Sequence, residues 1–189
     1  NSSIFRELLE KAPGTYHHSQ MVASLSESVS HRLNLSTPLL TAMALYHDIG
    51  KIDNPQFFTE NHTIYQNPHH QLAPHESSKH ITSHVADGVE KARKLKLPAR
   101  MIDAIRQHHG TKLVKFFHEK YLELPSGERD QFHEQQFRYP GPKPRTIETA
   151  VIMLADQVEA ATRSLESYST EKVKTVIEDI ITANINEEQ

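Results

Sequence analysis

The sequence predicts an all-α protein. Its apolar residues recur every three or four positions, as on one face of a helix, and no stretch keeps the two-residue alternation of a strand. Proline or hydroxyl residues precede several of these stretches and glycine follows some of them, which is typical of helix starts and ends. With 189 residues, the chain is long enough for one domain with a sizeable core. We therefore expect a single helical domain over residues 1–189.

The first two expected helices both carry histidine. The first has one apolar face that is expected to be buried, and His18 lies on that same face. The apolar residues of this face are Val22, Leu25, Val29 and Leu33. The second helix begins at Pro38, which suits the first helical position after a capping hydroxyl residue. It runs into His47 and Asp48 and is expected to end at Gly50.

The rest of the chain alternates between helices and two long irregular stretches. These stretches, at about residues 53–75 and 125–145, are rich in proline and polar residues, and loops of this length are usually functional or mobile. We expect the middle of the second stretch to be poorly ordered. The remaining helices are expected at about residues 76–97, 98–109, 111–124, 146–167 and 170–183.

Composition excludes several functional classes. The net charge of −3 argues against a protein that binds nucleic acid polymers through a basic surface. The absence of cysteine excludes disulfides, thiolate metal sites and thiol nucleophiles, and it fits a cytosolic compartment. The longest aliphatic run, residues 150–155, is far too short to cross a membrane. Because the chain opens with Asn1 and not with methionine, we expect it to be a fragment of a longer protein.

Histidine is the unusual feature of the composition. There are 14 histidines, spread from His17 to His133, and histidine is the commonest side-chain metal ligand. Taken alone, the His47–Asp48 pair fits either a hydrogen-bonded histidine with a capping aspartate or half of a metal site. His18 alone fits either a structural hydrogen bond or a ligand, because a buried imidazole without a partner is costly.

Four further residues bear on the choice between a metal site and structural roles. Asp156 follows the apolar run at 150–155, so its carboxylate is expected to be buried and either paired with Arg163 or bound to a cation. His84 lies on a helix, away from the centre of its apolar face. Neighbouring residues on a helix point about 100° apart, so His108 and His109 can reach one ion only where the helix ends.

Gly110 supplies such an end directly after the two histidines. The alternative is a partly exposed pair of imidazoles that interacts with the C-terminus of the helix. Taken together, five histidines and two aspartates lie at expected helix ends or on expected buried faces. This nitrogen and oxygen set suits Fe, Mn, Ni, Co or Zn. Seven ligands are too many for one ion, whereas two ions that share a carboxylate would use them all.

The order of these residues resembles the HD-domain superfamily of metal-dependent phosphohydrolases. His18, the His47–Asp48 pair and Asp156 match the pattern H…HD…D. His84 and the "QHHGT" run at 107–111 match the residues that binuclear members add. The strings "YHDIGK", "HHGT" and "RYPGPKP", in this order, are similar to one subgroup from about Gly14 to the C-terminus. That subgroup is the cytosolic HD domain of the seven-transmembrane HD proteins, bacterial phosphodiesterases that hydrolyse cyclic di-AMP.

The resemblance implies an HD-domain helical bundle and a binuclear site that holds two divalent transition-metal ions, with Fe or Mn favoured. One ion would be held by His18, His47, Asp48 and Asp156. The other would be held by Asp48, His84, His108 and His109. A hydroxide activated by both ions would attack phosphorus and open cyclic di-AMP to linear pApA, with Asp48 and Lys51 as the catalytic residues.

The substrate contacts implied are Lys51, Arg138, Tyr139 and Lys143. Lys51 would reach a phosphate, and the alternative is a solvated lysine beyond a helix end. Arg138 and Lys143, together with Arg145, would hold phosphate and Tyr139 would stack on adenine, and the alternative is an exposed proline-rich connector. The string "RYPGP" differs from the "GYP" signature of the related cyclic di-GMP phosphodiesterases, which favours cyclic di-AMP.

Two other functions stay open at this stage. An HD phosphohydrolase could act on cyclic di-GMP, a nucleoside triphosphate or an alarmone, and an HD module could sense a nucleotide without catalysis. The resemblance also implies that the chain is the cytoplasmic domain of a bacterial membrane protein whose transmembrane region lies outside this sequence. A homodimer is compatible with the sequence, which does not decide the oligomeric state.

Overall fold

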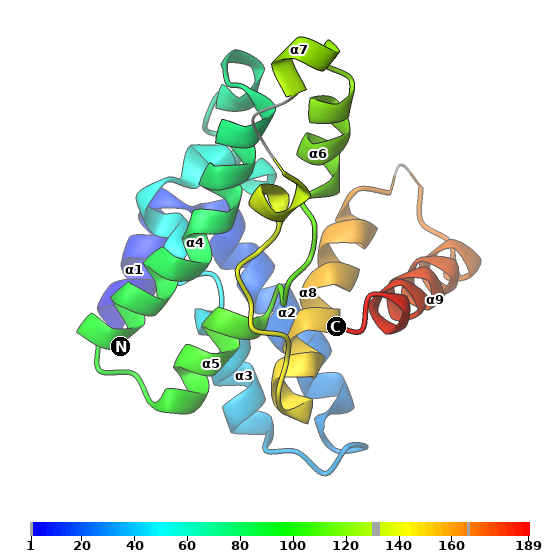
Figure 1. Cartoon of the computed structure of the whole chain (residues 1–189). Helices are drawn as coiled ribbons and strands as arrows, with labels where there is room; N and C mark the ends of the chain where they lie inside the picture. Colours follow the sequence, from blue (N-terminus) through cyan, green and yellow to red (C-terminus); the bar gives the residue numbers. More distant parts are fainter. Residues whose placement is uncertain (1, 130–132, 166) are drawn as a thin grey trace.

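The computed structural model describes residues 2–129, 133–165 and 167–189 (Figure 1). The elements described there are helical, and the only extended pairing among them is an isolated bridge between Leu113 and Arg138, so the predicted all-α class is confirmed. The α-helices are α1 Ser2–Lys11, α2 Pro13–Ser30, α3 Thr37–Tyr46, α4 Pro74–Lys94, α5 Ala99–Gln107, α6 Lys115–Leu122, α7 Ser126–Arg129, α8 Ile147–Arg163 and α9 Thr170–Asn186. The 3-10 helices are η1 Ile49–Asp53, η2 Pro55–Phe57, η3 Thr59–Asn61, η4 Pro68–Gln71 and η5 Glu134–Phe137.

The main core lies between α2, α3, α5 and α8. Fully buried aliphatic side chains from these helices meet there, including Val22, Leu40, Ile105 and Ile152. Each such side chain contributes about 1.5–3 kcal/mol of transfer free energy. Helix α1, which was not expected from the sequence, closes one side of this core with Ile4 and Leu8. A smaller cluster of Phe117, Tyr121 and Phe137 lies between α6 and η5.

Glycine allows the turn after α3 to lie directly against α4. A Cβ at Gly50 would be 1.9 Å from the backbone oxygen of His84 and 2.5 Å from the backbone nitrogen of Gly88. No side chain fits in this space, so the backbones of η1 and α4 are in contact. This contact brings the residues at the end of α3 next to His84.

The expected helix boundaries differ from the observed ones at several ends. The prediction that Gly50 ends the second helix is wrong, because α3 ends at Tyr46 and Gly50 lies within η1, packed on the backbone of α4. Helix α4 ends at Lys94 and α8 at Arg163, before the expected ends at 97 and 167, whereas α9 continues past 183 to Asn186.

Helix α2 ends at Ser30, so Leu33 lies beyond it, and Val29 and Leu33 are 37% and 45% exposed, which makes the prediction of a buried face wrong at these two residues. The helix expected at 111–124 begins only at Lys115. The residues before it instead bond to the segment around η5, since Val114 donates to Phe137 O and Tyr139 donates to Lys112 O.

The two irregular stretches are more regular than expected. The stretch at about 53–75 contains the 3-10 helices η2, η3 and η4, and four of its residues, Pro55, Phe57, Phe58 and Asn61, are buried. The stretch at about 125–145 contains α7 and η5. Its middle, at residues 130–132, lies outside the described residues, and so does residue 166 at the end of the helix expected at 146–167.

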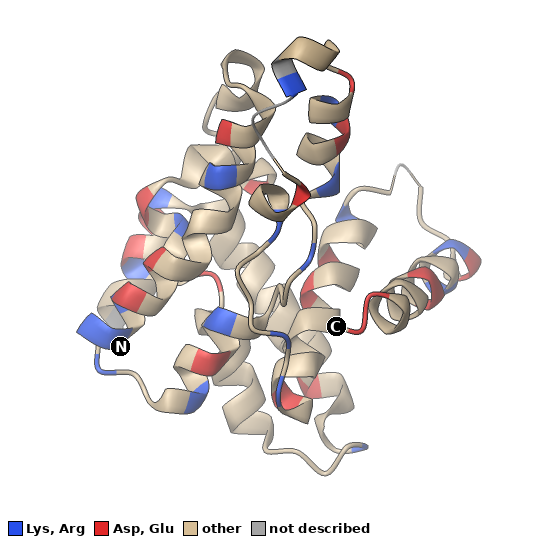
Figure 2. Cartoon of the chain, in the orientation of Figure 1, with Lys and Arg blue, Asp and Glu red and all other residues tan. Residues whose placement is uncertain are grey.

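Helix α9 is the most peripheral helix in Figure 1 and packs on α8 near the C-terminus. Basic and acidic residues are interspersed along the ribbons of α4 and α9 (Figure 2), in keeping with the small net charge of −3. Within the described ranges, no helix has both the length and the apolar content that a membrane span requires.

We predict that Gly50→Ala destabilises the protein strongly, because the new methyl group would collide with the backbone of α4. The expected loss is at least about 1–3 kcal/mol in the free energy of unfolding, measured by urea denaturation. Gly127→Ala is the matched control, because a Cβ there would meet nothing within 4 Å, and it should change stability by less than about 0.5 kcal/mol. Equal stability of the two variants would contradict the close contact between η1 and α4.

Candidate metal centre

Seven predicted ligand residues lie together at the junction of the helices. His18 comes from α2, His47 and Asp48 follow α3 directly, His84 comes from α4, and Asp156 comes from α8. His108 and His109 follow α5 directly. Six of the seven residues are buried, and the side chain of His109 is 18% exposed.

These residues form two groups that share one carboxylate. In each group, one ligand atom from each residue lies within 4.8 Å of the others. The first group is His18, His47, Asp48 and Asp156, and the second is Asp48, His84, His108 and His109. The two groups have the membership that the resemblance implied.

The two carboxylate oxygens of Asp48 face different groups. Its Oδ2 lies 3.5 Å from Nε2 of His18 and 3.2 Å from Nε2 of His47. Its Oδ1 lies 3.3 Å from Nε2 of His84 and 3.4 Å from Nε2 of His108. Asp48 is therefore oriented to bridge the two groups, one oxygen to each.

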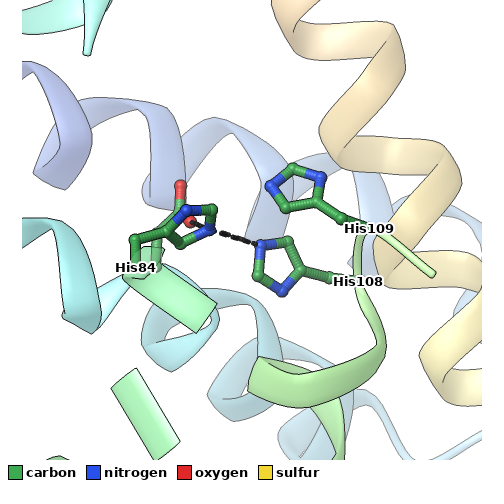
Figure 3. Close-up of side chains that lie close together, drawn as sticks. His84, His108 and His109 are labelled. Atoms are coloured by element: carbon green, nitrogen blue, oxygen red, sulfur yellow. Dashed lines mark hydrogen bonds and ion pairs between the residues drawn. The ribbon is translucent and has the colours of Figure 1, made fainter. Parts of the chain in front are cut away.

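The end of α5 allows the side chains of His108 and His109 to point towards the same site, although adjacent residues within a helix would point about 100° apart. Helix α5 ends at Gln107, and Gly110 has a φ of +54° in the turn that follows, so His108 and His109 lie in this turn and not within the helix. Figure 3 shows the rings of His84, His108 and His109 converging from α4 and from the end of α5. The Nε2 atoms of His84 and His108 are 3.2 Å apart. At most one proton fits between two such nitrogens, whereas a cation would accept an electron pair from each.

Backbone carbonyls fix three of the imidazoles. Nδ1 of His47 bonds to Ala44 O at 2.6 Å, and Nδ1 of His84 bonds to Ile81 O at 2.6 Å. Nδ1 of His108 bonds to its own i−3 carbonyl at 2.9 Å. A carbonyl accepts only, so each Nδ1 carries the proton and the Nε2 that faces Asp48 is left as the ligating nitrogen.

The donor set fits bound cations, because four of its buried atoms have no hydrogen-bond partner among the described residues. Among the buried side-chain atoms that the structure describes, Nε2 of His18, Nε2 of His47 and both carboxylate oxygens of Asp48 make no hydrogen bond of acceptable geometry. These atoms face one another at the centre of the site. Buried polar atoms are nearly always paired, and divalent cations would satisfy all four atoms.

Electrostatics keeps the carboxylates ionised. Burial would raise the pKa of Asp48 and of Asp156, but neighbouring imidazoles, and Lys51 in the case of Asp48, hold both pKa values well below their usual range. Burial would lower the pKa of His47, yet the charge of Asp48 and contact with Asp156 raise it to about 10, so a bound cation would replace the proton on its Nε2. His18 follows the same pattern, because its contacts with the carboxylates of Asp156 and Glu159 raise its pKa against the effect of burial.

The second group behaves differently. Burial lowers the pKa of His108, and it lowers that of His109 further, with the neighbouring imidazole adding to the effect. Both imidazoles are therefore neutral at physiological pH, which is the form that binds metal.

Asp156 does not pair with Arg163, the alternative that the sequence left open. Its Oδ1 lies 3.0 Å from Nε2 of His18, and its Oδ2 lies 3.6 Å from Nδ1 of His109. The guanidinium of Arg163 instead lies 3.3 Å from Glu159 and 3.9 Å from Glu60.

Lys51 is buried at the edge of the site, so the alternative of a solvated lysine is wrong. Its Nζ lies 2.6 Å from Oδ2 of Asp48 and 2.9 Å from Oε1 of Glu60. Burial opposes the charge of Lys51, but these two carboxylates raise its pKa above the usual value, so the ammonium stays charged.

The other predicted substrate-binding residues lie along the segment that follows η5. The ring of Tyr139 is 9% exposed and stacks on His109 with the ring centroids 4.1 Å apart. Arg138 bonds to Glu134 and to Thr111 O, and Lys143 donates to Glu187 O. Tyr139 therefore borders the ligand cluster, whereas the two cations have partners outside it.

Two carboxylates near the ligands were not anticipated. Glu159 accepts a hydrogen bond from Nδ1 of His18, and Glu60 contacts Lys51. For Glu159, its place one turn after Asp156 on the same helix was a usable signal. Glu60 lies in a stretch without periodicity, and nothing in the sequence marked it.

The chain has curated relatives of similar sequence, and two of them share a name. The chain is 42% identical over its full length to cyclic-di-AMP phosphodiesterase PgpH of Bacillus subtilis, of which it covers 26%. It is 41% identical, over 96% of its length, to the protein of the same name in Listeria monocytogenes, of which it covers 25%. The chain thus spans about a quarter of the length of these curated relatives.

Solved structures give the same result. The crystal structure of the L. monocytogenes phosphodiesterase PgpH HD domain superposes with a TM-score of 0.92 at 40% identity, and the match covers 100% of this chain and 87% of that one. The structure of that domain in complex with cyclic di-AMP also has a TM-score of 0.92, with 99% and 84% covered. The HD-type bundle expected from the resemblance is thereby confirmed.

Residues 15–161 match the family described as HD domain, and this range includes all seven ligand residues. The family match and the cluster of histidine and aspartate side chains together indicate a site for divalent metal. This chain belongs to the HD domain family.

Proposed function

We propose that the chain is a metal-dependent phosphodiesterase that hydrolyses cyclic di-AMP to linear pApA at a binuclear centre. The observation that carries this proposal is the pair of ligand groups joined by Asp48. It occurs in a chain whose relatives at 41% and 42% identity are named cyclic-di-AMP phosphodiesterases. The structural relative with cyclic di-AMP bound supports the choice of substrate.

The ligand residues would hold two ions. His18, His47 and Asp156 would hold one ion, and His84, His108 and His109 the other, with Asp48 between them. When bound, a pair of divalent ions lowers the pKa of a water molecule and neutralises charge on phosphoryl oxygens. The nitrogen and oxygen ligands without thiolate favour Fe or Mn over softer ions.

Lys51 and Tyr139 supply the substrate contacts nearest the ligands. The charged Nζ of Lys51 lies beside the bridging carboxylate, where it would hold a phosphoryl oxygen and balance the charge that develops on it. Tyr139 would form an aromatic wall next to His109. Arg138 and Lys143 would act further out, after leaving their present partners. Attachment to a membrane through a region outside this sequence, and a homodimer, stay predictions.

The most direct test is metal content. We expect about two divalent ions per chain after purification in metal-replete medium, measured by inductively coupled plasma mass spectrometry, because two complete ligand groups are present. Asp48→Ala removes a ligand from both groups, so metal content should fall towards zero and hydrolysis of cyclic di-AMP should be lost. A wild-type chain that binds no metal under these conditions, or an active metal-free Asp48→Ala variant, would refute the proposed function.

Lys51→Gln tests the role of the buried ammonium separately from that of the ligands. We predict that metal content is retained while kcat falls by about 10²-fold, because one preorganised charge next to the phosphate is lost. Lys91→Gln is the matched control, since Lys91 also forms an ion pair, with Asp53 at 3.0 Å, but at the surface. Unchanged kcat in Lys51→Gln would remove Lys51 from the catalytic residues.

Substrate choice is tested by turnover of several nucleotides under the same conditions. We expect cyclic di-AMP to be cleaved to pApA, with kcat/KM at least about tenfold above that for cyclic di-GMP. A nucleoside triphosphate and an alarmone should not be hydrolysed. Faster turnover of one of these would change the substrate but keep the enzyme class. Tight binding of cyclic di-AMP without turnover by the metal-loaded protein would instead favour the nucleotide sensor.

A further inference from the structure

His18 differs from the other buried ligand histidines in how its ring is held. His47, His84 and His108 each bond through Nδ1 to a backbone carbonyl three residues earlier. Their orientation is therefore set within their own segments. Nδ1 of His18 instead bonds across the bundle to the carboxylate of Glu159, which is 141 positions away on α8.

Glu159 is itself fixed in place. It is 8% exposed, and its Oε2 lies 3.3 Å from Nη1 of Arg163, one turn later on α8. It lies one turn after Asp156, whose Oδ1 is 3.0 Å from Nε2 of the same histidine. The two sides of the His18 ring thus face two carboxylates from one helix, of which one belongs to the ligand group and the other does not.

An acceptor at Nδ1 decides which nitrogen of His18 can ligate. With the proton held on Nδ1 by Glu159, the lone pair is on Nε2, which points towards Asp48 and Asp156. A carboxylate in this position also increases the basicity of the ring more than a carbonyl does. We propose that Glu159 is a positioning residue for His18, so that only the ion site formed by His18, His47, Asp48 and Asp156 depends on it.

This proposal rests on the proposed function, because it requires that the two ligand groups bind ions. It adds an asymmetry between the two sites. In the site formed by Asp48, His84, His108 and His109, Nδ1 of His84 and Nδ1 of His108 bond to backbone carbonyls. Nδ1 of His109 lies 3.6 Å from Asp156, so none of these three rings is held by Glu159. Loss of Glu159 should therefore weaken one site and leave the other unchanged.

The experiment is a titration of the metal-stripped full chain with Mn²⁺, with both dissociation constants resolved by calorimetry. For Glu159→Ala we expect one Kd to rise by about 10- to 100-fold, as is typical for loss of a group that orients a metal-bound histidine. The other Kd should stay within about twofold of wild type. Glu159→Gln should have a smaller effect on the same Kd, because the amide oxygen still accepts a hydrogen bond although the charge is lost.

Glu148→Gln is the matched control. It makes the same chemical change on the same helix, where Glu148 pairs with Arg100 at 3.4 Å outside the ligand groups, and both Kd values should match wild type. Thermal unfolding of the metal-stripped variants, followed by circular dichroism, reports whether each one folds. Glu159→Gln keeps the volume of the side chain, so the test stands even where Glu159→Ala does not fold.

Three outcomes would overturn the proposal. In the first, both Kd values of the folded Glu159 variants match wild type, which leaves His18 correctly held without Glu159. In the second, both sites weaken equally, which indicates a general structural role. In the third, wild type binds no Mn²⁺, which overturns the proposed function as well. Only the third outcome affects both, so the two failures are distinguishable.

Discussion

The buried charge of Asp48 is the constraint on which the rest of the site depends. Its carboxylate is 1% exposed and ionised, and an uncompensated anion in such a place would cost several kcal/mol. Lys51 compensates part of this charge, with its Nζ 2.6 Å from Oδ2. Imidazole nitrogens from α2, the end of α3, α4 and the end of α5 face the two oxygens, where bound cations would compensate the rest. The helices that form the apolar core are thus also the ones that must meet around one negative charge.

Lys51 shows what such a polar interior does and does not contribute. Its ammonium lies between Asp48 and Glu60 and stays charged. The desolvation of three charged groups offsets most of their attraction, so this cluster is weak evidence for stability. The effect of this cluster is geometric, because it fixes the ammonium of Lys51 beside Asp48, the carboxylate that joins the two ligand groups. The apolar residues around α3 and α5 supply the stability that allows this arrangement.

Most of the candidate ligands could be predicted from the sequence because they carry a local mark, whereas His84 lies off the centre of its apolar face and was matched only through the resemblance to the HD-domain superfamily. Gly110 follows two histidines, and an apolar run precedes Asp156. The role of Glu159 is not visible locally beyond its place one turn after Asp156, because it meets His18 over a separation of 141 positions. The same reason explains the helix that starts late at Lys115, since its expected first turn pairs with a distant segment near Phe137. The local sequence pattern predicts which residues are candidate ligands and where most helices lie. Long-range contacts determine where the helices begin and end, and which side chains orient the ligands.

The stretch at about 53–75 shows how an irregular segment becomes part of a precise site. Asn61, which is fully buried, donates to Oγ1 of Thr15 and accepts from its backbone N–H. A Cβ at Gly14 would lie 1.9 Å from Glu60 O, so only glycine allows η3 to lie this close to α2. These contacts fix the backbone of Glu60, and Oγ1 of Thr15 also donates to its carboxylate at 3.0 Å. A carboxylate held in this way can keep the ammonium of Lys51 beside Asp48. The irregular segment therefore contributes to the site by fixing Glu60, the second carboxylate that contacts Lys51.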